Sequence, residues 1–159
     1  MGDFDFLVGT WTVANRRLKQ RLAGCTEWEE FTSTSRCWNL FGGAANIDEF
    51  SFPDGTNGLT LRLLDPATKE WSLNWSSSET GTLLPPVVGH FDATLGRFYG
   101  DDAHDGTPVR VRYIWSEITP TSARWEQAFS SDGGQTWETN WVMDFARVGQ
   151  SDSSAESIL

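Results

Sequence analysis

The segment EWEEFTSTSRCWNL, residues 27–40, decides the fold class because its side chains divide cleanly between two faces. One of these faces carries Trp28, Glu30, Thr32, Thr34, Arg36 and Trp38. A period of two is typical of a β-strand, since successive side chains of a strand point to opposite faces. The segment therefore predicts an extended strand, and the same period recurs in both directions along the chain.

Further strands, joined by short turns, are predicted on either side of this segment. Clusters of Gly, Pro, Asp and Asn separate them, which is ordinary turn chemistry. The connections are too short for crossover helices, so the sheet is predicted to be antiparallel. One helical turn is expected over Asp3 to Leu7, capped by Asp3 and ended by Gly9. The expected strands are residues 10–22, 27–40, 45–52, 59–64, 70–77, 87–91, 97–101, 109–117, 123–130 and 136–147.

Ten strands joined by hairpins expose two sheet edges unless the sheet closes on itself. The sequence therefore predicts an all-β protein, an antiparallel up-and-down β-barrel of about ten strands formed by residues 1–149. A sandwich of two sheets is the alternative architecture. The Ser-rich segment 150–159 is predicted to be a disordered tail.

Composition and charge narrow the class of partner. The 159 residues include 9 Trp, 10 Phe and 2 Tyr, and the formal net charge is -10. A chain this acidic lacks the positive surface that nucleic acids and anionic membranes require, so neither is expected as a partner. The acidic start and the absence of a long apolar stretch predict a cytoplasmic protein, with Cys25 and Cys37 as reduced thiols. The oligomeric state is left open.

Two motifs carry a resemblance to a known superfamily. Gly9-Thr10-Trp11 in the first strand and Arg147 at the end of the last resemble the calycins, which include lipocalins, fatty-acid-binding proteins and nitrobindins. In calycins a late Arg packs across the Trp of a Gly-x-Trp motif and shuts one end of the barrel. The segments FDFLVGTW (4–11) and DGGQTWETNW (132–141) are similar to uncharacterised bacterial calycin-like proteins. Haem-binding nitrobindins have an axial His on the closing strands, and residues 123–147 contain none, so haem is not expected.

A barrel of ten strands is too wide for its side chains to fill, so a cavity is expected in the lumen. Rings that point inward would form a cage for a small, mostly apolar or aromatic molecule, although they could instead fill the barrel. Gln127 shares a face with two rings and needs a hydrogen-bond partner there. The predicted ligand-binding residues are Trp75, Tyr113, Trp115, Trp125, Gln127, Phe129, Trp141 and Arg62.

The orientation of Arg62 has two interpretations. An inward Arg62 could hold a carboxylate, as the resemblance to fatty-acid-binding proteins implies. An outward Arg62 is favoured here, because Leu59, Leu61 and Leu63 occupy the opposite face of the same strand. An outward carboxylate is likewise the default for Asp48 and Glu49, whose strand has no clear inner face.

The alternative function is a cofactor-free isomerase, cyclase or hydratase that acts on a small biosynthetic intermediate in the same cavity. Its candidate acid–base residues are Tyr113, Glu49, Glu29, Asp48 and Tyr99. A carboxyl group held in an aromatic lumen would have a raised pKa, which suits proton transfer near neutral pH. No cofactor and no metal are expected, because the acidic loop DDAHDG (101–106) lacks the ligand spacing of a calcium site and phosphate-binding motifs are absent.

Overall fold

A computed structural model describes residues 2–149 as one antiparallel barrel, which confirms the predicted fold class and the closure of the sheet. The segment 150–159, predicted to be a disordered tail, lies outside the described residues. Each strand pairs with its neighbours in the sequence, and the first pairs with the last. The strands are β1 (Gly9–Leu18), β2 (Trp28–Leu40), β3 (Ala45–Ser51), β4 (Asn57–Leu64), β5 (Trp71–Ser77), β6 (Val87–Asp92), β7 (Leu95–His104), β8 (Thr107–Ser116), β9 (Ser122–Ser130) and β10 (Glu138–Arg147).

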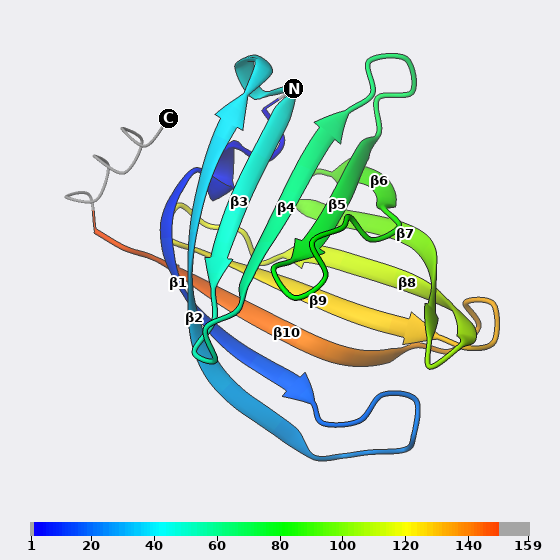
Figure 1. Ribbon diagram of the computed structural model, residues 1–159. Helices are drawn as coiled ribbons and strands as arrows, with labels where there is room; N and C mark the ends of the chain where they lie inside the picture. The colour runs from blue at the N-terminus through cyan, green and yellow to red at the C-terminus, as the bar shows by residue number, and fades with distance from the viewer. Residues whose placement is uncertain (1, 150–159) are drawn as a thin grey trace.

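The two chain ends close the barrel by lying side by side. β1 pairs with β10 from Trp11 opposite Arg147 to Arg17 opposite Trp141 (Figure 1). This pairing leaves neither terminal strand as an open edge, and it rules out the sandwich of two separate sheets. Alternation then sends Trp11, Val13 and every second residue of β1 toward the lumen.

The first strand is shorter than the sequence predicts. β1 ends at Leu18 rather than at residue 22, because the backbone bends over residues 19–23; within this stretch Leu22 has a positive φ of 58°. The Leu22 N–H donates to the Glu138 carboxylate at 2.7 Å, so the connection between β1 and β2 is tied to β10. The other predicted strands agree with the observed ones to within a few residues.

The N-terminal segment closes one end of the barrel. The helical turn η1 (Asp5–Leu7) packs Phe4 and Leu7 into the core, and Phe4 contacts Trp71 at 4.9 Å and Phe91 at 5.1 Å between ring centroids. The predicted cap by Asp3 is wrong, since no side chain caps this turn. The Asp3 carboxylate instead accepts a hydrogen bond from Trp71 Nε1 at 2.9 Å, which anchors the segment to β5.

Arg147 fastens this closed end. Its guanidinium carbon lies 4.3 Å from the centre of the Trp11 ring, as the motif predicts. Its two terminal nitrogens donate to the carbonyl oxygens of Phe6 and Val8 at 2.7 and 2.6 Å. Gly9 has a φ of 125°, and a side chain there would collide with the guanidinium. The Gly-x-Trp motif therefore makes room for the arginine that holds the plug in place.

The opposite end is the mouth of the barrel, ringed by the connections β1–β2, β3–β4, β5–β6, β7–β8 and β9–β10. The second short helical turn, η2 (Phe41–Gly43), lies at the closed end between β2 and β3. The seam between β5 and β6 is the loosest, because regular pairing there covers three residue pairs, Trp71 to Leu73 with Val87 to Gly89. Beyond them the sheet is held by a bridge between Ser76 and Leu83.

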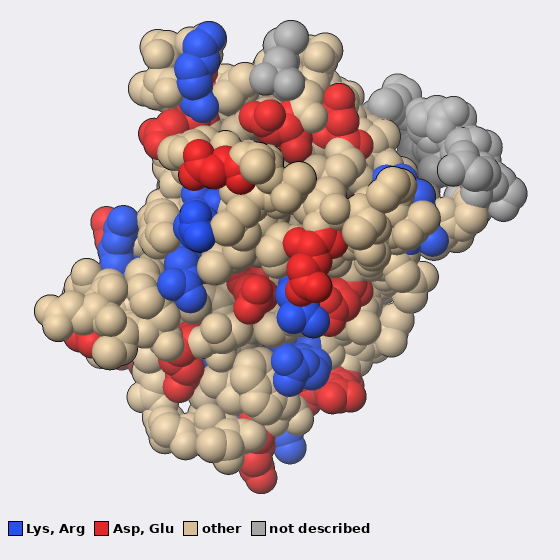
Figure 2. Space-filling view, turned by 180° about the vertical axis from the view of Figure 1, so that it is seen from behind, with Lys and Arg blue, Asp and Glu red and all other residues tan. Residues whose placement is uncertain are grey.

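The outer surface carries charges of both signs. Figure 2 shows Lys and Arg side chains scattered among Asp and Glu side chains on the face turned away from the viewer in Figure 1. The excess of acidic residues is therefore dispersed over this face and does not form one patch. Within residues 2–149, the helical turns are far too short to span a lipid bilayer.

Candidate functional site

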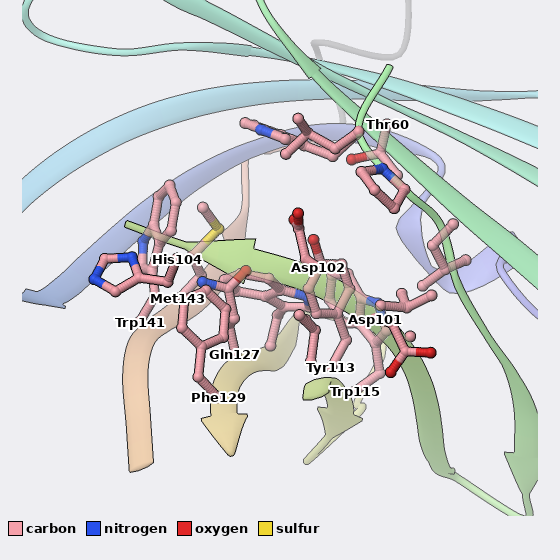
Figure 3. Close-up of a pocket in the computed structure, with 18 of the residues that line it drawn as sticks. Thr60, Asp101, Asp102, His104, Tyr113, Trp115, Gln127, Phe129, Trp141 and Met143 are labelled. Carbon is pink, nitrogen blue, oxygen red and sulfur yellow. The ribbon is translucent and has the colours of Figure 1, made fainter. Parts of the chain in front are cut away.

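The lumen contains a cavity of about 330 Å³ between the plug and the mouth. All eight residues predicted to bind a ligand line it, together with parts of β3 to β10. Figure 3 labels Tyr113, Trp115, Gln127, Phe129 and Trp141 among them. The rings fill one end of the barrel and leave a space at the other. The sequence allowed the rings either to fill the barrel or to form a cage around a cavity, and each of these predictions describes part of the lumen. Whether these eight residues bind a ligand stays a prediction.

The cavity wall is a set of rings in edge-to-face contact. Tyr113 lies 5.0 Å from Trp125, and Trp125 lies 5.7 Å from Trp141, with interplanar angles of 75° and 82°. On the other side Phe50 contacts Trp75 at 6.0 Å. Such contacts are favourable for aromatic quadrupoles and fix each ring against its neighbours. The wall is therefore preorganised for a flat or apolar molecule.

Trp141 is also held from behind by polar groups on β1. Its Nε1 donates to Asn15 Oδ1 at 2.9 Å, and the Asn15 amide nitrogen donates to Ser33 Oγ at 2.9 Å. Arg17 stacks on the same indole at 4.8 Å and forms an ion pair with Glu29 at 2.8 Å. These contacts fix the orientation of the ring that Trp141 presents to the cavity.

Gln127 finds its hydrogen-bond partner on the neighbouring strand. Its amide nitrogen donates to Asn140 Oδ1 at 2.8 Å, and both residues are buried. β10 has a register shift between Thr139 and Trp141, so one extra residue opposes β9 at this point. This bulge lets Asn140 support Gln127 while the next residue, Trp141, still faces the lumen.

The floor of the cavity holds a buried ion pair. Arg62 donates from Nη2 to Asp48 Oδ2 at 2.6 Å and from Nη1 to Asn46 Oδ1 at 2.7 Å. Arg62 and Asp48 are each 2% exposed, so the outward orientations expected for both are wrong. Asp48 also accepts the Thr60 backbone N–H at 3.0 Å, and Arg62 stacks on Phe4 at 5.0 Å. Inward placement is stabilised because the two opposite charges neutralise each other and share these hydrogen bonds. Within residues 2–149, Arg62 Nε is buried without a hydrogen-bond partner.

Cys37 lies beside this ion pair at the closed end. Its thiol donates to Asn46 Oδ1 at 3.2 Å, and burial raises its pKa to about 12. Cys37 and Cys25 are both free thiols. Because its thiolate form is suppressed, Cys37 is suited to a structural role in the core and not to nucleophilic chemistry.

The mouth carries polar side chains around one phenol. Arg21, Asp102 and His104 line the cavity with Tyr113. Figure 3 shows Asp102, His104 and Tyr113 in this wall. Burial raises the pKa of Tyr113 to about 12, and the negative charge of Asp102 adds to this shift. Burial also lowers the pKa of Arg21, with a further contribution from Arg17, while the Arg21 guanidinium stacks on Phe129 at 5.4 Å.

The structure does not bring the five candidate acid–base residues together. Tyr113 faces the cavity, whereas Asp48 is locked beneath Arg62 and Glu29 is half-exposed at the rim in its ion pair with Arg17. Glu49 is exposed on the outer face, as expected, and Tyr99 packs outside the barrel against Trp137 at 6.0 Å. In the described part of the chain, no three His, Cys, Asp or Glu side chains are grouped so that they could hold a metal ion.

Sequence reasoning missed several residues that line the cavity. Alternation alone could have found Met143 and Phe145, which share a face with Trp141, and Asp102, which follows Gly100 and Phe98 on the inner face of β7. Arg21 had no such signal, because it lies in a connection whose path over the mouth depends on the contact between Leu22 and Glu138. The other lining residues not predicted include Phe50, Thr60, Leu73 and His104.

Comparison with known structures supports the fold. The chain is similar to the S-type phycobiliprotein lyase CPES from Guillardia theta, with a TM-score of 0.56 and 13% sequence identity. The likeness covers 92% of this chain and 91% of the lyase. No protein-family model and no curated protein matches the sequence. At this identity the likeness concerns the fold alone.

Proposed function

We propose that the protein binds a small, mostly apolar or aromatic molecule in the lumen of the barrel. The cavity of about 330 Å³, walled by rings and closed at one end, is the observation that carries this proposal. Its size is within the range of small-molecule sites. Burial of apolar surface and contact with the rings would supply the affinity, while Gln127 and Tyr113 would orient the ligand.

The calycin resemblance is consistent with this function. The Arg147 guanidinium stacks on Trp11, as in the motif, and one solved structure similar to this chain is named as a phycobiliprotein lyase. Membership of the calycins, a cytoplasmic location and a small molecule as the partner remain parts of the proposal. The catalytic alternative gains no support, since the acid–base candidates are dispersed and Tyr113 keeps its proton to high pH.

A direct test is native mass spectrometry of the full chain purified from its own host. A bound molecule that dissociates at a defined mass would identify the ligand. Binding of a simple probe can be tested in parallel by isothermal titration calorimetry with naphthalene, which is an apolar aromatic molecule.

Trp125 is the central ring of the wall, so Trp125→Ala should weaken naphthalene binding about tenfold or more. Trp28→Ala is the matched control, because Trp28 lies on the outer face of β2 beneath Arg16 at 4.9 Å. Equal affinities of the wild type and Trp125→Ala would remove Trp125 from the site. Absence of naphthalene binding to the wild type, together with no co-purifying molecule, would refute lumen binding itself.

A further inference from the structure

The hydrogen-bond acceptors at the floor of the cavity are already engaged by the protein. Asp48 Oδ2 accepts from Arg62 Nη2 at 2.6 Å, and Asp48 Oδ1 accepts the Thr60 N–H at 3.0 Å. Asn46 Oδ1 accepts from Arg62 Nη1 at 2.7 Å and from the Cys37 thiol at 3.2 Å. A ligand group that only donates hydrogen bonds would therefore compete at the floor with bonds that the protein already makes.

The donors at the floor, in contrast, are in excess. Arg62 Nε and Trp115 Nε1 are both buried, and neither has a hydrogen-bond partner among residues 2–149. Both side chains line the cavity, and each of the two residues is 2% exposed. Native proteins leave few buried N–H groups without an acceptor, because the lost hydrogen bonds to water are then not replaced. An acceptor that a ligand brings to the floor would replace them.

The two unpartnered donors belong to neighbouring side chains. The Arg62 guanidinium carbon lies 5.8 Å from the centre of the Trp115 ring. Two N–H groups that share one oxygen lie within about 6 Å of each other, because each N–O distance is about 2.9–3.0 Å. Side chains this close can direct both N–H groups to one acceptor, and a carbonyl oxygen has the two lone pairs that this requires.

The charge of the floor decides whether this acceptor is ionic. Arg62 and Asp48 form an ion pair whose side chains are 3% and 2% exposed, so the positive charge of the guanidinium is already neutralised. A ligand carboxylate would place a second anion beside Asp48 with one cation to serve both, and a buried charge without a partner is unfavourable. An uncharged carbonyl group accepts the same two hydrogen bonds and adds no charge.

We propose that the ligand enters the cavity with an uncharged carbonyl group first, and that the carbonyl oxygen accepts hydrogen bonds from Arg62 Nε and Trp115 Nε1 at the floor. A ketone, an ester or a tertiary amide has this chemistry. The rest of the ligand then lies among the rings of the wall. The inference rests on the proposed binding in the lumen, and it adds the orientation of the ligand and the class of its innermost group.

Three probes with the same ring system separate the possibilities: 2-acetylnaphthalene, 2-isopropenylnaphthalene and 2-naphthoate. The second probe has a C=CH₂ group where the first has C=O, so it keeps the planar shape and loses the acceptor. Dissociation constants are measured with the full chain at neutral pH by isothermal titration calorimetry. We expect the ketone to bind tightest, about tenfold more tightly than the alkene, since it gains two hydrogen bonds.

Trp115→Phe tests one of the two donors, because it removes the indole N–H and keeps an aromatic ring. The preference for the ketone over the alkene should fall about fivefold, and using this ratio cancels any change in packing that both probes feel. Trp28→Phe is the matched control. Trp28 lies on the outer face of β2 beneath Arg16 at 4.9 Å, so the ratio should stay unchanged.

Infrared spectroscopy tests the same contact in the wild type without any substitution. The carbonyl stretch of bound 2-acetylnaphthalene, labelled with ¹³C at the carbonyl, should lie at lower frequency than in an apolar solvent, because hydrogen bonds weaken the C=O bond. In Trp115→Phe it should move part of the way back. A frequency equal to that in the apolar solvent would contradict hydrogen bonding at the floor.

Asp48→Asn tests the role of charge. This variant keeps the shape of the side chain and removes the anion that neutralises Arg62, so 2-naphthoate binding should strengthen about tenfold. Unchanged 2-naphthoate binding would contradict the neutralised floor as the reason for an uncharged ligand group.

The outcomes distinguish this inference from the function on which it rests. Equal binding of ketone and alkene by the wild type, or an unchanged ratio in Trp115→Phe, would overturn the floor assignment while leaving lumen binding intact. Tightest binding of 2-naphthoate by the wild type would overturn the uncharged class of the innermost group. Failure of every probe, together with no co-purifying molecule, would refute lumen binding itself.

Discussion

At the scale of single residues, the pKa of the Tyr113 hydroxyl is the property that most directly reflects the interior of the barrel. It is one of two tyrosines, and the other, Tyr99, packs outside against Trp137. Burial raises the pKa of Tyr113 to about 12, and the charge of Asp102 contributes to the increase. A raised pKa means that the folded state holds this proton more tightly than the unfolded state. The resulting stabilisation is complete below pH 10 and is lost as the pH rises toward 12.

The variant Tyr99→Phe leaves Tyr113 as the sole tyrosine of the sequence. We expect this variant to show a single phenolate titration with a midpoint near pH 12. Ultraviolet absorbance of the phenolate measures it, and the same titration in denaturant should return to about 10. Asp102→Asn should lower the midpoint in the folded protein because a negative charge is removed. Asp101→Asn is the control, and a folded midpoint near 10 would contradict the burial of this hydroxyl.

Residue patterns also show how far the sequence could predict this site. Alternation identified seven of the eight predicted lining residues, because inward faces carry rings on β5, β8, β9 and β10. It gave the wrong orientation for Arg62, since the leucines on the other face of β4 resemble a core face. That outer face is itself apolar, with Trp38, Ile47 and Leu61 in register across three strands. The partner that makes an inward arginine stable, Asp48, comes from another strand, so no local pattern reveals it.

At the scale of elements, the seam between β5 and β6 is the weakest part of the barrel. Regular pairing stops at Leu73 opposite Val87. Nearer the mouth, the β5–β6 connection is held to β5 by a hydrogen bond from the Leu84 N–H to Trp75 O at 2.8 Å. Leu84 and Pro85 of this segment line the cavity. The seam is therefore the place where a small opening would connect the cavity to solvent beside the mouth.

Hydrogen exchange followed by NMR tests this weakness. The Leu84 amide should exchange faster, by at least about tenfold, than amides in the continuous pairing of β1 with β10, because local opening costs less where fewer strand hydrogen bonds break together. Pro85→Gly should accelerate exchange in this segment further, since it loosens the chain. Equal protection of Leu84 and of the β1–β10 pairing would contradict a weak seam.

At the scale of the whole molecule, the barrel depends on a closed end that is assembled from three distant parts of the chain. Arg147, at the end of β10, donates to the carbonyls of Phe6 and Val8 and also from Nε to Pro120 O at 3.0 Å. It therefore joins the plug, the β8–β9 connection and the last strand while it covers Trp11. A cavity that is open at one end only requires this junction to hold.

Arg147→Lys keeps the positive charge but loses the planar fork that reaches several carbonyls at once, so it should still destabilise the protein. We expect the free energy of unfolding to fall by about 1–3 kcal/mol, the usual cost of leaving buried polar groups unpaired. Urea denaturation measures it. The matched control is Arg124→Lys on the outer face of β9, where the ion pair with Asp144 at 2.8 Å is exposed and should contribute less than about 1 kcal/mol. Equal losses in the two variants would mean that Arg147 acts only as a surface charge, and the plug would then need another anchor.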